Sequence, residues 1–198
     1  FIDKLIDHLH PEIEAKMLDL ACGKGRFSKY LADKGFRVTG LDLSENSIEH
    51  ARLYESENFS FFTQDMRKVF RINYFDFIFS FFTSFGYFTS EKDDLKSLKS
   101  VASGLNKNGI YVLDFFNAKY VIDNLIPNET KEIDGIEFNI HKEIRGLHVF
   151  KNISFTIDNE NYQFEERVRL FTLSDFEKLI EKAGLILVKT FGDYQLSD

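Results

Sequence analysis

The chain has 198 residues, of which 43% are hydrophobic and 29% charged, and its formal net charge is −7. This size and composition are typical of one globular domain, and the acidic balance disfavours a nucleic-acid partner, because binding phosphates needs a basic surface. The single cysteine excludes a framework of internal disulfides. The sequence shows neither a signal-peptide pattern nor an apolar run of about 18 residues, so we expect a cytoplasmic protein that does not enter a membrane.

The first part of the chain alternates between helix and strand patterns. Helices are predicted over residues 2–10, 25–34, 45–54 and 91–104. Strands are predicted over residues 16–20, 37–41, 59–63, 74–80 and 110–116, the last after a turn at 107–109. Strands that alternate with helices form right-handed crossovers, which give a mainly parallel sheet with helices on both faces. The sequence therefore predicts an α/β fold.

The pattern changes in residues 117–171. After a short helix over 118–126 this segment has no helix signal, and its alternating residues are interrupted by turn pairs such as Asp134-Gly135 and Arg145-Gly146. Such pairs connect the strands of hairpins. We therefore expect an antiparallel β insertion, which lies within a single domain spanning residues 1–198.

The α/β pattern returns after the insertion. A helix is predicted over 173–182, because Thr172 or Ser174 can cap its start and Gly184 lies just past its end. A strand over 185–191 is expected to follow it.

The most informative motif is the turn after the first strand. Residues 17–27 read Met-Leu-Asp-Leu-Ala-Cys-Gly-Lys-Gly-Arg-Phe, which is a buried strand, a turn of small residues and the start of a helix. Gly23 and Gly25 carry no Cβ, so a ligand can approach the backbone closely, and the helix start offers N–H groups to it. Asp42, at the end of the second strand, can bind both hydroxyls of a ribose. These features predict a nucleoside cofactor.

Two residues near this turn argue against a dinucleotide. The dinucleotide fingerprint has a third glycine, and Ser28 stands at that position here. Asp19, inside the first strand, would repel a pyrophosphate and attract the α-ammonium group of an amino acid. A nicotinamide oxidoreductase is therefore the less favoured interpretation.

Residues 19–25, Asp-Leu-Ala-Cys-Gly-Lys-Gly, and residues 40–44, Gly-Leu-Asp-Leu-Ser, together resemble the class I S-adenosylmethionine-dependent methyltransferases. Ala21 stands where many members of that family have glycine. Asp65 and Asp76 follow in the expected order, so the resemblance covers nearly the whole chain. It implies a Rossmann-like methyltransferase fold with S-adenosylmethionine as the cofactor.

The C-terminal part carries the same resemblance in Gly184-Leu185-Ile186-Leu187 and in Phe191-Gly192-Asp193-Tyr194. In this family a seventh strand, antiparallel to the others, follows the sixth. We expect that strand to lie beyond Asp198.

The resemblance assigns cofactor contacts to the ends of four strands. It implies that Asp19 reaches the ammonium group of the methionine part, that Asp42 binds the ribose, and that Leu43 packs on the adenine. Asp65 would accept a hydrogen bond from the exocyclic amine, and Met66 would supply an apolar wall. The implied cofactor-binding residues are Asp19, Ala21, Cys22, Gly23, Gly25, Asp42, Leu43, Gln64, Asp65, Met66, Ser80 and Phe81. The Cys22 side chain is interpreted as a small buried filler and not as a nucleophile.

The catalytic residues are left unassigned. Methyl transfer from a sulfonium mainly requires the acceptor to lie about 3–3.5 Å from the methyl carbon, and a base is needed only if the acceptor loses a proton. Phe85 and Tyr87 lie in an aromatic loop and are candidates to face the acceptor, with plain packing on the insertion as an equal alternative. The His residues show no metal-ligand spacing, so no metal site is expected.

The leading interpretation is a methyltransferase for a small-molecule acceptor. In it the insertion acts as a lid, sets the choice of substrate and can also form a homodimer contact. The alternatives are a non-catalytic S-adenosylmethionine-binding protein or partner subunit and, less favoured, an RNA methyltransferase or an NAD-dependent oxidoreductase. Which atom of the acceptor is methylated does not follow from the sequence.

Overall fold

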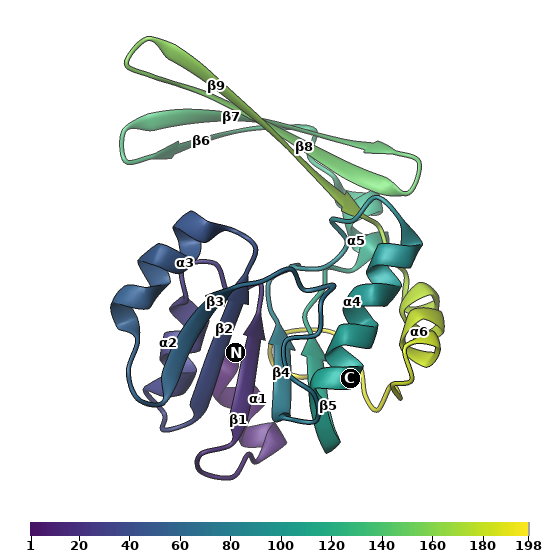
Figure 1. Cartoon of the computed structure of the whole chain (residues 1–198). Coiled ribbons are helices and arrows are strands. Elements are labelled where there is room, and N and C mark those ends of the chain that lie inside the picture. The colour runs from purple at the N-terminus through teal and green to yellow at the C-terminus, as the bar shows by residue number, and fades with distance from the viewer. Residues whose placement is uncertain (198) are drawn as a thin grey trace.

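The computed structural model of the protein describes residues 1–197, which form two β-sheets that lie one above the other (Figure 1). Within these residues sheet A has the strand order β3-β2-β1-β4-β5, and sheet B has the order β6-β7-β8-β9. The strands of sheet A are β1 (Lys16–Leu20), β2 (Arg37–Asp42), β3 (Phe59–Thr63), β4 (Phe75–Ser80) and β5 (Leu105–Leu113). The strands of sheet B are β6 (Asn128–Ile133), β7 (Ile136–Arg145), β8 (His148–Ile157) and β9 (Glu160–Arg169). The helices are α1 (Ile2–Leu9), α2 (Arg26–Ala32), α3 (Glu45–Ala51), the short 3-10 helix η1 (Arg52–Tyr54), α4 (Glu91–Gly104), α5 (Ala118–Asn124) and α6 (Leu173–Lys182).

Sheet A is parallel throughout, as the alternation of strands and helices predicts. Met17 of β1 is buried with Leu31 of α2 and Ile48 of α3, whereas the next residue, Leu18, is buried with Val101 of α4. Successive side chains of a strand point to opposite faces, so both faces of the sheet are apolar. Helices α1, α2 and α3 therefore cover one face and α4 covers the other (Figure 1).

Sheet B is the antiparallel insertion that the sequence predicts. Its hairpin turns include Asp134-Gly135, with φ of 53° and 78°, and Asp158-Asn159, with φ of 51° and 64°. These left-handed conformations are easiest for Gly, Asn and Asp, which explains why these residue pairs end the strands. Helix α5 leads into sheet B, and β9 leads out of it to α6.

One face of sheet B carries apolar side chains on neighbouring strands, and its Val168 lies beside the loop after β4. Ile140, Ile153 and Phe164 are cross-strand neighbours on this face, and Val168 lies further along it. A Cβ placed on Gly86, in the loop after β4, would lie 3.2 Å from Val168 Cγ1. Because β5 runs into α5 and sheet B, the carboxyl ends of the parallel strands all lie on the side of sheet A that sheet B covers (Figure 1).

Within residues 1–197 the chain enters sheet B from α5 and leaves it toward α6 at the same end of the sheet (Figure 1). At this end the backbone N–H of Arg169 donates to the carbonyl of Gly86 at 2.9 Å, and its guanidinium lies 3.6 Å from Asp94 of α4. Asp94 is 1% exposed and its carboxylate has no hydrogen-bond partner, and this burial raises the pKa of the carboxyl to about 6.

The predicted strand over 185–191 is wrong, because these residues form no strand in the structure. Ile186 and Val188 are 86% and 90% exposed, so the apolar residues of this segment do not pack in a sheet. A strand forms only where its backbone finds a pairing partner, which an alternating pattern cannot supply. The expected seventh strand would follow Asp198 and lies outside the described residues.

Strand β5 also differs from its prediction, because it spans 105–113 and not 110–116. Leu105 pairs with Phe75 and Ile110 pairs with Phe77, so five residues of β5 advance against two of β4. The predicted turn at 107–109 therefore forms an irregularity inside the strand, with Asn108 at φ 66°.

Candidate cofactor and acceptor site

The turn between β1 and α2 lies at the carboxyl edge of sheet A, and three of its residues are left-handed. Ala21, Gly23 and Gly25 have φ of 64°, 55° and 78°. The Cys22 N–H donates to the Leu41 carbonyl at 2.9 Å, and the Gly25 N–H donates to the Cys22 carbonyl at 3.0 Å. The strand therefore ends in a tight turn held by backbone hydrogen bonds, one within the turn and one to β2, as expected from the small residues of the motif.

The two glycines of this turn have different reasons to be glycine. A Cβ on Gly23 would meet no atom within 4 Å, so this position is open to a ligand. A Cβ on Gly25 would lie 2.3 Å from Cζ of Phe61, which is buried in β3. Glycine is therefore required at position 25 by packing, because the Phe61 ring fills the space that a Cβ would need, and the contact of its backbone with a cofactor stays a prediction.

Asp19 is a buried carboxylate one strand position before the turn. Its side chain is 3% exposed and accepts a hydrogen bond from the Ser28 hydroxyl of α2 at 2.6 Å. Burial raises the pKa of Asp19 to about 6, and the neighbouring Asp42 carboxylate adds to the shift. Ser28, the residue in place of a third glycine, thus fixes the orientation of Asp19. A buried carboxylate of this kind is stabilised by an added cation.

Asp42, at the end of β2, braces the turn from the neighbouring strand. One carboxylate oxygen accepts from the Gly23 N–H at 2.8 Å and the other accepts from the Ser44 N–H at 2.8 Å. A carboxylate oxygen can accept more than one hydrogen bond, so both oxygens keep capacity for ligand hydroxyls. The adjacent Leu43 is 72% exposed and is free to pack on a flat group.

Cys22 has the surroundings of a filler and not of a nucleophile. Burial raises the pKa of its thiol, and the Asp19 and Asp42 carboxylates raise it further. A reactive cysteine needs the thiolate form, which this environment opposes.

The turn after β3 carries the residues expected at the adenine. The Asp65 carboxylate binds the Arg67 guanidinium at 2.6 Å, and Met66 packs against the buried cluster on the α4 side of sheet A. Gln64 donates from its side-chain amide to the Lys68 carbonyl at 3.3 Å. Asp65 is therefore already paired with a side chain of its own turn.

The end of β4 continues into a strained loop. Ser80 and Phe81 are 2% and 5% exposed, and Ser80 accepts a hydrogen bond from the Tyr111 hydroxyl at 3.1 Å. The next residues, Phe82 and Thr83, have φ of 54° and 58°, a conformation that is rare for residues with large or branched side chains.

Asp114, just past the end of β5, holds this loop in place. Its carboxylate accepts from the Phe82 N–H at 2.8 Å and from the Tyr194 hydroxyl at 3.1 Å, and its backbone carbonyl accepts from Thr83. The Phe82 ring stacks on Phe27 of α2 with ring centres 4.6 Å apart. These contacts connect the loop after β4 with the helix that follows the turn at 21–25.

The two acceptor candidates lie in different surroundings. Phe85 is 2% exposed, with its ring 5.5 Å from Phe171 and 5.9 Å from Phe176, so it belongs to the core and not to an open surface. The expectation that Phe85 faces an acceptor is corrected on this ground. Tyr87 is 48% exposed, and partial burial together with Glu166 of β9 raises the pKa of its hydroxyl.

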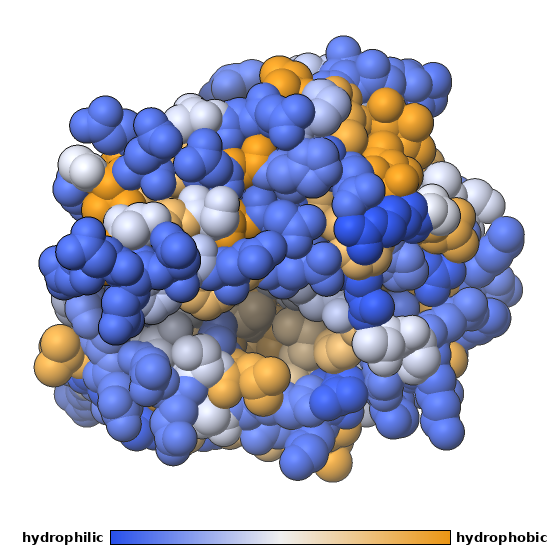
Figure 2. All heavy atoms as spheres, turned by 90° about the horizontal axis from the view of Figure 1, so that it is seen from above, coloured by the Kyte–Doolittle hydropathy of each residue, from blue (hydrophilic) through white to orange (hydrophobic). Residues whose placement is uncertain are grey.

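Seen from the side of sheet B, the surface of the molecule is hollowed, and hydrophobic side chains contribute to the walls of the hollow (Figure 2). Among residues 1–197 no group of three or more His, Cys, Asp and Glu side chains is placed to hold a metal ion. None of the helices in this part of the chain is both long and apolar enough to cross a membrane.

Sequence reasoning missed the residues that brace the site. The sequence does not predict that Arg67 and Tyr194 contact the site, and it gives Phe27 only as part of the start of a helix. Each of them acts through a partner on another segment, and the spacing of residues in one sequence carries no signal for such pairs.

The residues present fit S-adenosylmethionine. The open backbone at Gly23 leaves room for a ligand, the buried Asp19 carboxylate suits an ammonium group, and Asp42 suits the hydroxyls of a ribose. These groups meet on neighbouring strands, since Asp19 pairs with Gly40 of β2 and with Phe79 of β4.

Comparison with known proteins points to the same family. A family model described as a methyltransferase domain matches residues 17–109. The chain is 32% identical over 203 aligned positions to "Putative methyltransferase YqeM" of Bacillus subtilis (strain 168), a match that covers 96% of this chain and 81% of that protein. It is 23% identical to the dTDP-3-amino-3,4,6-trideoxy-alpha-D-glucopyranose N,N-dimethyltransferase of Streptomyces venezuelae, over 93% of this chain and 80% of that protein.

The fold agrees with these relatives. The solved structure of an S-adenosylmethionine-dependent methyltransferase from Clostridium acetobutylicum ATCC 824 matches with a TM-score of 0.78 and 22% identity, covering 92% of this chain and 77% of that one. The Rossmann-like fold with its antiparallel insertion is thus the expected one. The chain belongs to the class I S-adenosylmethionine-dependent methyltransferases, and S-adenosylmethionine is its cofactor.

Proposed function

We propose that the protein transfers the methyl group of S-adenosylmethionine to a small-molecule acceptor that binds between the carboxyl edge of sheet A and sheet B. The observation that carries this proposal is the 4.6 Å stacking of Phe82 on Phe27. It connects the loop that carries Tyr87 directly with the helix that starts at the turn of Gly23 and Gly25. A cofactor held by that turn and an acceptor held by that loop would therefore be neighbours.

In this proposal the cofactor residues keep the roles that the family resemblance implies. Asp19 holds the ammonium group, Asp42 holds the ribose and Leu43 covers the adenine. The backbone of Ala21, Cys22, Gly23 and Gly25 holds the methionine part; Gln64, Asp65 and Met66 form the adenine contact; Ser80 and Phe81 end the strand beside the cofactor. The cofactor supplies a methyl group on a positive sulfur that becomes neutral on transfer. The protein then has mainly to bind and orient the two partners.

On the acceptor side, we propose that Tyr87 contacts the acceptor and that sheet B is the lid that sets which acceptor enters. The acidic net charge of −7 disfavours RNA as the acceptor. The Streptomyces venezuelae relative, named for methylating an amino sugar, supports a small molecule and places amino sugars first among compounds to test.

Two measurements test this function. Calorimetric titration is expected to show binding of S-adenosylhomocysteine and none of NAD, and binding of NAD alone would overturn the assignment. A cofactor-consumption assay across amino sugars, other amines, phenols and RNA then separates an enzyme from a non-catalytic binding protein. We expect turnover with one small-molecule class, reduced by Tyr87→Phe with cofactor affinity unchanged.

The homodimer contact through the insertion stays a prediction. Ile133 and Phe164 of sheet B are 55% and 54% exposed and mark where it would form. Light scattering of the protein and of a Phe164→Ser variant tests it, since a dimer built on this face would become a monomer in the variant.

A further inference from the structure

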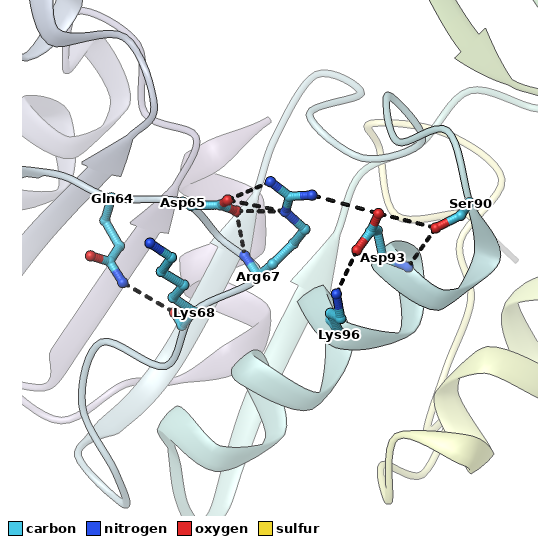
Figure 3. A network of polar contacts seen from close by, with 7 residues as sticks. All are labelled: Gln64, Asp65, Arg67, Lys68, Ser90, Asp93 and Lys96. Carbon is cyan, nitrogen blue, oxygen red and sulfur yellow. Dashed lines mark hydrogen bonds and ion pairs between the residues drawn. The ribbon is translucent and has the colours of Figure 1, made fainter.

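The Asp65 carboxylate is bound by a single residue, Arg67, on several sides. One carboxylate oxygen accepts from the Arg67 backbone N–H at 2.9 Å and from Nε at 3.0 Å. The other accepts from Nη2 at 2.6 Å and from Nε at 3.0 Å (Figure 3). A guanidinium that meets a carboxylate along two parallel bonds fixes its orientation as well as its charge.

These bonds leave the carboxylate able to accept one more. A carboxylate offers about four acceptor positions, and Arg67 uses about three of them with its backbone, Nε and Nη2 protons. Hydrogen bonding to Arg67 also holds the pKa of Asp65 below its usual range, so the group is ionised at neutral pH. Asp65 is thus an oriented anion with room for one further donor, such as an exocyclic amine.

Arg67 also reaches the acceptor side of the site. Its Nη1 lies 3.6 Å from the Asp93 carboxylate in the first turn of α4, and its guanidinium lies 5.2 Å from the centre of the Phe88 ring. Asp93 is itself held by Lys96 at 2.9 Å and by the Ser90 hydroxyl at 3.0 Å (Figure 3). Phe88 directly follows Tyr87, so one side chain touches both the turn after β3 and the loop after β4.

We propose that Arg67 is a positioning residue of the cofactor site, which aims the Asp65 carboxylate at the adenine amine and couples it to the loop that carries Tyr87. The inference rests on the proposed function, because it takes Asp65 as the acceptor for adenine. It adds a residue to the site that the family resemblance did not assign, and it makes recognition of the base depend on the acceptor loop.

The test is the preference of the protein for adenine over hypoxanthine. S-Inosylhomocysteine carries a carbonyl oxygen where S-adenosylhomocysteine carries the amine, so it faces an aimed carboxylate with an acceptor and not a donor. In the unchanged protein the Kd values of the two compounds, measured by calorimetry, are expected to differ by about tenfold or more. This ratio corresponds to the free energy of one hydrogen bond to a charged group. In Arg67→Met the ratio is expected to fall to about threefold or less, with a smaller change in Tm.

Two further variants serve as a conservative substitution and as a control for this test. Arg67→Lys keeps the positive charge but loses the two-nitrogen contact of the guanidinium, so it is expected to retain only part of the preference for adenine. This variant replaces Arg67→Met in the test if Arg67→Met does not fold. Arg71→Met is the matched control, since Arg71 stacks on Tyr74 at 4.2 Å and should leave the ratio unchanged.

The coupling to the acceptor loop has its own test. Phe88→Leu is expected to lower the base preference about two- to threefold in the unchanged protein and not at all in Arg67→Met, because the ring acts through the guanidinium. Equal effects of Phe88→Leu in both backgrounds would contradict the coupling.

The possible failures are distinguishable. An unchanged preference for adenine over hypoxanthine in Arg67→Met would overturn the positioning role. A stronger preference would also overturn it, and would mean that Arg67 competes with the base for Asp65. Tight binding of S-adenosylhomocysteine without any preference would remove Asp65 as the adenine acceptor and the inference with it. Binding of neither compound would instead contradict the proposed function.

Discussion

The carboxylate of Asp114 accepts a hydrogen bond from the backbone N–H of Phe82 at 2.8 Å, so the end of β5 holds the loop that leaves β4. Phe82 and Thr83 are both left-handed in that loop, a conformation that side chains with Cβ branches or rings avoid. The loop after β4 is therefore kept in an unfavourable conformation by a side chain from another segment.

Removing this carboxylate is expected to loosen the loop. Asp114→Ala leaves the Phe82 N–H without its partner, so the free energy of unfolding should fall by about 1 kcal/mol, as measured by urea denaturation. Asp114→Asn keeps an oxygen acceptor and should lose less than half as much. Asp123→Ala, which removes an exposed carboxylate of α5, is the control and should change little. Equal stability of Asp114→Ala and the unchanged protein would contradict this role.

Replacing Ala21 by glycine is expected to stabilise the protein. Ala21 has φ 64°, where glycine has no steric penalty, so Ala21→Gly should raise the free energy of unfolding by about 0.5–1 kcal/mol. The matched control is Ala102→Gly inside α4, which should lower it by about 1 kcal/mol because glycine weakens a helix. A loss of stability in both variants would show that the turn does not strain Ala21.

Substitutions of the two glycines of the turn are expected to affect different properties, stability at Gly25 and ligand binding at Gly23. Gly25→Ala places a Cβ 2.3 Å from the Phe61 ring and should lower the free energy of unfolding by about 2–4 kcal/mol, as chemical denaturation would show. Gly23→Ala meets no neighbouring atom, so it should lose only about 1 kcal/mol but weaken S-adenosylhomocysteine binding. Phe61→Leu in the Gly25→Ala background should recover part of the loss. No recovery would mean that the clash with Phe61 is not the cause.

In its proposed role at the ammonium group, Asp19 is expected to give the cofactor affinity a pH dependence. Its pKa is raised to about 6, so the carboxylate is protonated at lower pH and can no longer attract an ammonium group. Affinity for S-adenosylhomocysteine, measured by calorimetry between pH 5 and pH 8, should therefore fall below about pH 6. Asp19→Asn should bind S-adenosylhomocysteine weakly at every pH in this range, without the fall in affinity below about pH 6. A fall of the same size in the variant would show that another group causes it.

The same shift acts on stability with the opposite sign. The folded protein holds the Asp19 proton more tightly than the unfolded chain, whose carboxyl titrates near 3.8. The contribution of Asp19 therefore becomes more favourable as pH falls from about 6 toward 4, and Asp19→Asn should be more stable than the unchanged protein at pH 7. A variant that binds worse but folds better identifies a carboxylate that is kept for its ligand.

The sequence could predict the parts of the site that neighbouring residues build. The turn at 21–25, Asp19 and the place of Asp42 beside them lie on one strand–turn–helix unit and the next strand, so local patterns suffice. The bond between Asp114 and Phe82 joins residues 32 positions apart, and that between Tyr194 and Asp114 joins residues 80 positions apart. Such contacts depend on how the elements pack, which spacing along one chain does not encode.

Two incorrect expectations have the same physical origin. Residues 185–191 have the composition of a strand, but pairing decides whether a strand forms. Phe85 lies in an aromatic loop that is expected to face an acceptor, but Phe171 and Phe176 bury its ring. In both cases a residue's tertiary neighbour, and not its local preference, settled the outcome.

Because sheet B is attached at one end, a small rotation there moves its opposite end over a larger distance. Strand β9 has 10 residues, and an extended strand of that length spans about 33 Å. A rotation of only about 10° at the anchored end would therefore move the far hairpin by about 6 Å, which is wider than an aromatic ring is thick. In the proposed role of sheet B as a lid, the few atoms around Gly86, Asp94 and Arg169 would control the width of an opening far larger than themselves, and a change of one side chain there would alter which molecules fit without touching any of them.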